Sequence, residues 1–119
     1  MSWIEVRLTA EEAGRTRLEI EHIAAAGDRK WAEFGPGAVG IGWDMTIMGL
    51  SLHLAGQSVP GPRSFAAWAA SGEGKRFMEL SGNGWCEAHI GSGEDEAGAR
   101  AMAGRTIAFY TGSPGEPSG

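Results

Sequence analysis

His22 is the residue of this chain whose type and position best suit acid–base or binding chemistry. It continues the alternation of Leu18 and Ile20, so its imidazole should point toward the core side at the end of a strand, where it could hydrogen-bond a ligand or cap a backbone carbonyl. A structural role is the favoured interpretation. Asp44 and His53 stand nine positions apart on roughly opposite faces of one helical run, so they cannot form a local acid–base pair.

Cys86 and His89 have the spacing of two metal ligands, but a Cys-x-x-His without a second pair is a weak indication of a metal site. As a nucleophile, Cys86 would need a base and electropositive surroundings, whereas its neighbour is Glu87. Glu19 and Glu21 resemble a catalytic carboxylate pair, but both fall on the solvent face of a strand. We therefore expect a buried or half-buried thiol, with no metal and no cofactor.

Residues 35–40, Gly-Pro-Gly-Ala-Val-Gly, match the glycine spacing of a dinucleotide-binding loop. Such a loop should follow a buried parallel strand and precede an acidic residue by about 20 positions. Here a charged, helix-like run precedes it, and no Asp or Glu occurs between Asp44 and Glu73. Close helix packing is the better interpretation of these glycines.

The composition narrows the class of protein. The chain has 119 residues, enough for one domain at most. Its 15 acidic residues against 10 basic ones argue against a protein that follows nucleic-acid phosphates. Cys86 is the single cysteine, and the first residues, Met-Ser-Trp-Ile-Glu, lack the pattern of a signal peptide. These features predict a cytoplasmic protein.

Two alternating runs, residues 3–9 and 17–23, predict a β-hairpin with one apolar and one charged face. Pairing Arg7 with Glu19 places opposite charges across the ladder and also brings Val6 against Ile20. This register is preferred, although it leaves Glu5 facing Glu21.

The next segment, residues 35–54, predicts a long helix with two adjacent apolar stripes. One stripe comprises Val39, Trp43, Ile47, Leu50 and Leu54, and the other Ile41, Met45, Met48 and Leu52. A helix that is apolar nearly all round should be mostly buried. A membrane span is disfavoured because Asp44 lies inside the run, His53 lies near its end, and glycines reduce its hydrophobicity.

Other helical signals flank this segment. Asp28 could cap a short turn that holds Trp31 and Phe34, and Ser64 could cap a helix that carries Phe65 and Trp68. Helical patterns also cover residues 77–90 and 94–110. A break or a frayed turn is expected at residues 81–84, because Ser-Gly-Asn-Gly is a poor helix sequence. Residues 113–119 are expected to form a disordered tail.

Three stretches resemble the C-terminal half of a START-like (SRPBCC) domain, in the branch related to activators of the ninety-kilodalton heat-shock chaperone ATPase. They are Ser-Trp-Ile-Glu-Val-Arg-Leu at 2–8, Thr-Arg-Leu-Glu-Ile-Glu-His at 16–22 and Phe-Gly-Pro-Gly-Ala-Val-Gly-Ile-Gly-Trp-Asp at 34–44. Later stretches, at 67–71, 87–89 and 108–112, resemble a helical extension found in some members. The resemblance covers about residues 2–112, and its order is more specific than its single motifs.

The resemblance implies an α+β helix-grip fold in which a curved antiparallel sheet wraps a long helix around an apolar cavity. It implies a single partial domain over residues 1–112, made of a hairpin (2–23), a short turn and long helix (28–56) and a helical extension (64–110). The implied ligand-binding residues are Val6, Leu18, Ile20 and His22 on the strands, with Trp43, Ile47, Leu50 and Leu54 on the helix.

The strands and helices that open such a domain are not found before Trp3. Because a lone hairpin is marginally stable and has unpaired edges, we expect a truncated product, or a sheet completed by a second copy or a partner chain.

The leading functional hypothesis is binding of a small hydrophobic ligand in a START-like cavity, without catalysis. A protein-interaction module of the chaperone-regulator type is one alternative. The other is a polyketide cyclase-like enzyme, for which His22 and Asp44 are the only plausible acid–base groups. No nucleic-acid or membrane partner is expected.

Overall fold

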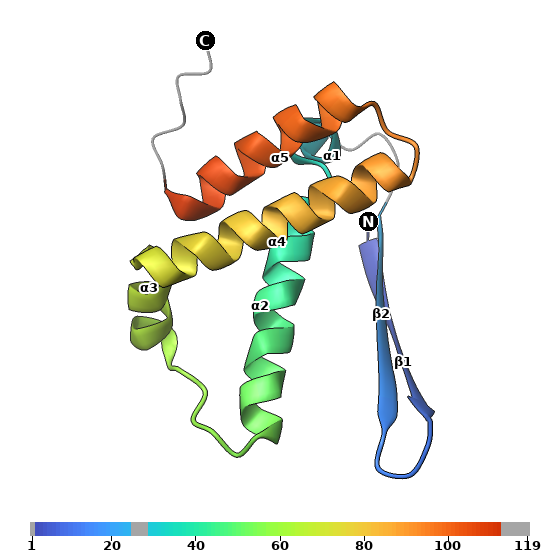
Figure 1. Cartoon of the computed structure of the whole chain (residues 1–119), viewed down its shortest axis with the longest axis vertical. Coiled ribbons are helices and arrows are strands. Elements are labelled where there is room, and N and C mark those ends of the chain that lie inside the picture. Colours follow the sequence, from blue (N-terminus) through green and yellow to red (C-terminus); the bar gives the residue numbers. More distant parts are fainter. Residues whose placement is uncertain (1, 25–28, 113–119) are drawn as a thin grey trace.

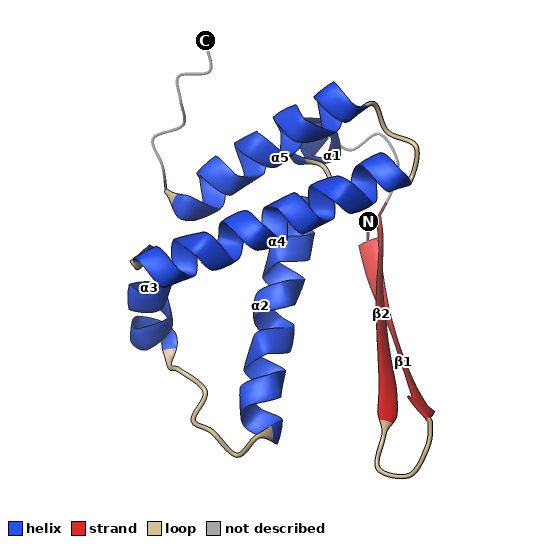
Figure 2. Cartoon of the chain, viewed as in Figure 1, coloured by secondary structure: helices blue, strands red, loops and turns tan. Residues whose placement is uncertain are grey.

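The computed structural model describes residues 2–24 and 29–112 of the chain. Within these residues the fold is mixed α+β, with a two-stranded antiparallel hairpin and five helices (Figures 1 and 2). The elements in chain order are β1 (Ser2–Ala10), β2 (Thr16–Ala24), α1 (Arg29–Phe34), α2 (Gly37–Leu54), α3 (Pro62–Ala70), α4 (Gly72–Gly91) and α5 (Glu96–Thr111). The cap expected at Asp28 and the tail expected at 113–119 lie outside the described residues.

The hairpin has the predicted register. Arg7 pairs with Glu19, Val6 pairs with Ile20, and Glu5 faces Glu21. The connecting turn uses a positive φ of 80° at Gly14, a conformation that costs glycine little. The alternation of apolar and charged residues, together with the opposite charges across the ladder, was therefore sufficient to predict the pairing.

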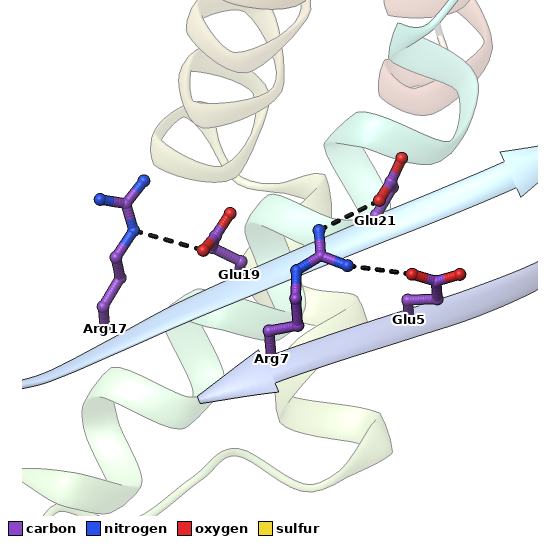
Figure 3. Close-up of polar contacts among 5 residues, drawn as sticks. All are labelled: Glu5, Arg7, Arg17, Glu19 and Glu21. Carbon is purple, nitrogen blue, oxygen red and sulfur yellow. Dashed lines mark hydrogen bonds and ion pairs between the residues drawn. The ribbon is translucent and has the colours of Figure 1, made fainter. Parts of the chain in front are cut away.

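Arg7 explains how the hairpin accommodates Glu5 opposite Glu21. Its guanidinium donates to Glu5 Oε1 at 2.9 Å and to Glu21 Oε1 at 3.0 Å, so that one cation lies between two carboxylates (Figure 3). Arg17 and Glu19 form a second pair on the same face, with 3.5 Å between Nε and Oε1. These side chains are well exposed, and such pairs contribute little each to stability.

The other face of the hairpin is apolar. It carries Ile4, Val6, Leu8, Leu18, Ile20 and His22, which the register places in three cross-strand pairs. Val6 is 58% exposed and Leu8 70% exposed, so much of this face is uncovered by the described residues.

The buried core lies where α4 and α5 pack together and cross the first turns of α2 (Figure 1). Ile41 of α2 is fully buried, and Met78, Cys86, Ala99 and Thr106 are buried with it. The prediction of a buried thiol at Cys86 is confirmed. Hydroxyl groups of α5 tie this region to the end of α1 and the start of α2: Thr106 donates to the carbonyl of Phe34 and Tyr110 to that of Ala38.

The break expected at residues 81–84 is wrong, because α4 is continuous from Gly72 to Gly91. The reason is tertiary packing. A Cβ at Gly82 would lie 2.5 Å from Ile107 Cγ1 and 3.4 Å from Ile41 Cδ1, so this glycine lets α5 and α2 approach α4 closely. The intrinsic cost of glycine in a helix is offset by that contact.

Two expectations about helix burial and capping are also corrected. Only Gly37, Gly40 and Ile41 of α2 are buried, because α4 and α5 cover its first turns and leave the rest partly open. Ser64 does not cap α3, which begins after Gly61 with Pro62 in its first turn. Side-chain caps are instead present at Ser71 for α4 and at Asp95 for α5.

The hairpin stands beside α2 as a separate layer (Figures 1 and 2). Each strand makes extensive contact only with the other strand. A hydrogen bond from Trp43 Nε1 to His22 Nδ1, at 3.2 Å, connects the hairpin to α2. In the part of the chain that is described, no helix combines the length and apolar character needed to cross a membrane.

Candidate functional site: an apolar groove on the long helix

An open apolar groove runs along one face of α2. Its volume is about 740 Å³. Residues from α2, the following loop, α3 and the start of α4 line it: Gly42, Met45, Thr46, Met48, Gly49, Leu52, Val59, Pro60, Phe65, Trp68 and Glu73.

The chain path creates this groove. After α2 ends at Leu54, residues 55–61 cross to α3, which packs against the start of α4 (Figure 1). Val59 and Pro60 thereby face the apolar stripe of α2 across the groove. The lining residues come from several elements, so the walls of the groove depend on this return of the chain.

The aromatic wall is held by its own contacts. The ring of Trp68 lies 5.7 Å from that of Phe65 and 5.4 Å from that of Phe77, measured between centroids. Its indole Nε1 donates to Glu73 Oε1 at 3.0 Å. Such aromatic pairs and the hydrogen bond hold the indole in one orientation, so this wall is preorganised.

Two features make the groove suited to binding rather than to chemistry. Met45 and Met48 give it flexible, polarisable side chains that adapt to ligand shape. Its two polar side chains each have a partner within the chain, since Glu73 accepts from Trp68 and the Thr46 hydroxyl donates to the carbonyl of Gly42 at 2.9 Å. The arrangement favours an apolar molecule with few polar groups.

The ligand-binding residues predicted from sequence do not line the groove. Trp43, Ile47, Leu50 and Leu54 project from a face that is nearly opposite the groove, given the rotation of about 100° per residue. The structure brings together Trp43 and His22, whose rings meet edge to face at 6.2 Å. Ile47, Leu50 and Leu54 are exposed on the helix, as Val6 and Leu18 are on the hairpin, while Ile20 is half-buried.

Sequence reasoning recognised the stripe of Met45, Met48 and Leu52 but placed the ligand-binding residues on the other stripe, which lies on the opposite face of α2. It missed Val59, Pro60, Phe65 and Trp68 as wall residues. A usable signal was present, because a Pro-containing loop followed by aromatic residues three positions apart indicates a chain that turns back with one aromatic face.

Asp44 fills a structural position between α2 and α4. Its Oδ2 accepts from Ser81 Oγ at 2.5 Å and from Trp85 Nε1 at 3.0 Å. Asp44 thus links α2 to α4 through two hydrogen bonds.

His89 is 7% exposed, and its ring packs at 5.5 Å against Trp31, with Nε2 4.0 Å from Glu94. The described residues contain no group of three or more His, Cys, Asp or Glu side chains that could hold a metal ion.

The resolved pKa shifts lie outside the groove. Hydrogen bonding to Glu21 raises the pKa of Arg7, and hydrogen bonding to Glu96 and Glu87 raises that of Arg100. Burial raises the pKa of Tyr110 above 10.0. None of these shifts produces an acid or base suited to catalysis near neutral pH.

Comparison of the chain with protein-family models, with curated proteins and with solved structures found no match.

Proposed function

We propose that this protein binds a small hydrophobic molecule in the groove on α2, without catalysing a reaction. The observation that carries the proposal is the groove of about 740 Å³ with its apolar, methionine- and aromatic-rich lining. Its volume falls within the range of about 300–1,000 Å³ that is usual for small-molecule sites. Burial of an apolar ligand there would supply the binding free energy.

We also propose a relationship to the START-like fold, in which a sheet grips a long helix. The support is the order of elements and the register of the hairpin, whose apolar face lies on the side of His22 and Trp43. On this view the residues predicted from the resemblance form a second apolar surface on α2. The groove is the better ligand site, because its apolar walls come from several elements of the chain.

Gly49 provides a direct test. It lines the groove, and a Cβ built on it meets no atom within 4 Å, so Gly49→Leu would place its side chain in the ligand space. Gly84→Leu is the matched control, since Gly84 lies within α4, also has open space around it, and does not line the groove. Both changes replace a helical glycine with a better helix former.

The probe is the neutral dye N-phenyl-1-naphthylamine, whose fluorescence rises in apolar surroundings. We expect Gly49→Leu to weaken dye binding by about tenfold or more, which corresponds to about 1.4 kcal/mol, and Gly84→Leu to leave it unchanged. Equal binding by both variants would overturn the groove as the site. If Leu50→Glu weakened dye binding and Gly49→Leu did not, the binding site would instead lie on the opposite face of α2.

A further inference from the structure

The free edge of β1 is the part of the hairpin that is least covered by the rest of the chain. All nine residues of β1 are exposed, whereas Glu19, Ile20, His22 and Ile23 of β2 are half-buried. β2 therefore lies toward the helices and β1 away from them. An exposed edge strand without proline or a bulge can pair with a strand of another chain.

The sequence of β1 is complementary to itself in the antiparallel direction. When two copies of Ser2–Ala10 overlap along their full length, the two-fold axis passes through Val6. Glu5 then lies opposite Arg7 of the second copy, and Arg7 opposite its Glu5. Ile4 lies opposite Leu8, so the apolar residues of the two strands share one face.

Shifting this register removes the complementarity. If the axis passes through Arg7, two arginines face each other, and if it passes through Glu5, two glutamates do. Like charges directly opposite each other in a ladder are destabilising. Full overlap at Val6 is therefore the register that satisfies both the charges and the apolar face.

The edge of β2 lacks this property. Full overlap of two Thr16–Ala24 strands has its axis at Ile20 and places Glu19 opposite Glu21 twice. The half-burial of β2 residues also limits access to that strand. The charge pattern thus selects β1 rather than β2.

We propose that two copies of this chain associate through antiparallel pairing of their β1 strands about Val6. The product is a four-stranded sheet in the order β2-β1-β1-β2. One face carries the apolar side chains of both hairpins, and the other carries the Glu5 and Arg7 pairs. This inference is independent of the groove and its ligand, which lie on the far face of α2.

A pair of charge-reversal variants tests the proposed contact. Each of Glu5→Arg and Arg7→Glu makes the two opposed charges alike in a self-pairing, whereas a mixture of the two restores opposite charges at both positions. By sedimentation velocity we expect the wild-type chain to show a concentration-dependent dimer. We expect each variant alone to dimerise about tenfold or more weakly, and the equimolar mixture to dimerise again. Arg17→Glu on β2 is the control, which should leave the dimer intact.

Two outcomes would overturn the proposal in this experiment: a wild-type chain that stays monomeric to millimolar concentration, or a control that loses the dimer as fully as Arg7→Glu.

A second experiment leaves the charges untouched. Val6→Cys places two cysteines opposite each other at the axis, while Leu8→Cys places them about four residues, or about 13 Å, apart along the strands.

A disulfide needs Cα atoms within about 7 Å, so Val6→Cys should form a covalent dimer on mild oxidation and Leu8→Cys should not. Leu8 is the more exposed of the two residues, so random collisions would favour the opposite order. Equal cross-linking, or faster cross-linking of Leu8→Cys, would contradict the register. Circular dichroism of each variant reports whether the fold is retained.

Discussion

The hairpin and the helical unit, defined here as residues 29–112, are held together by different means. The helical unit is stabilised by glycines that let helices approach closely, by a small buried core and by hydroxyl groups that bond carbonyls of neighbouring elements. The hairpin has two strands paired along their full length and an ion-pair network on one face, but its apolar face is largely exposed. Good pairing alone does not make a stable layer, since an isolated two-stranded hairpin is marginal in water.

The largest expected effect is at Gly40, where α2 and α4 meet. A Cβ at this residue would lie 2.3 Å from the ring of Trp85, whose indole is held by Asp44. We expect Gly40→Ala to lower the free energy of unfolding by about 2–3 kcal/mol, within the range for overpacked sites.

Gly49→Ala in the same helix is the matched comparison for Gly40→Ala. It should raise the free energy of unfolding by about 0.5–1 kcal/mol, because Gly49 has open space around it. Urea denaturation measures both changes. Equal effects of the two alanines would show that α2 and α4 are not packed as closely as described.

Asp44 should give the next largest effect, because it joins α2 to α4 through two hydrogen bonds. Asp44→Ala leaves two donors without their acceptor and should cost about 1–2 kcal/mol in unfolding free energy. Asp44→Asn retains an acceptor oxygen and should cost less. Glu79→Ala, at an exposed residue of α4, is the control. If it lowered the unfolding free energy as much as Asp44→Ala, the proposed link between α2 and α4 through Asp44 would be contradicted.

Trp43→Phe tests the link between the two regions. It removes the N–H donated to His22 while keeping an aromatic ring. We expect hairpin amides to become less protected by about 0.5–1 kcal/mol, the value of an ordinary hydrogen bond, with no change in α4.

Trp68→Phe is the comparison for Trp43→Phe, because it loses an equivalent indole hydrogen bond, to Glu73, far along the chain from the hairpin. Site-resolved hydrogen exchange distinguishes the two variants. Loss of hairpin protection in Trp68→Phe would contradict a local link at His22.

The smallest effect concerns Tyr110, which ties α5 to α2. Burial raises its pKa above the usual 10.0, so the folded state favours the neutral phenol. Its stabilising contribution is complete below pH 10.0 and is lost as the pH rises through the higher folded-state pKa. The melting temperature of the wild type should therefore fall relative to that of Tyr110→Phe above this pH. A constant difference between the two proteins across alkaline pH would refute the assignment.

The predictability of this molecule from sequence differs between the same two regions. The register of the hairpin and the apolar face of each strand were predicted correctly. Both follow from the alternation of apolar and charged residues and from the pairing of Arg7 with Glu19, all within two strands that are consecutive in the sequence. The continuity of α4 through Gly82 was not predicted, because the contact with Ile107 that offsets the helix cost of glycine comes from an element 25 positions away. The long helix was found, but its burial was overestimated.

The groove was missed for a similar reason. Met45, Met48 and Leu52 were recognised as an apolar stripe, but nothing local to α2 determines that Val59 and Pro60 return to face it. The resemblance to START-like domains directed attention to the opposite stripe of Trp43 and Ile47.

Native-state hydrogen exchange of the wild-type chain at low concentration is the most direct test of the division between the two regions. We predict that amides in α4 and α5 exchange only through global unfolding, while amides in β1 and β2 open with a free energy lower by several kcal/mol and independently of the helices. Equal opening free energies in the hairpin and in α4 would contradict this account, because they would require the two regions to share one cooperative core.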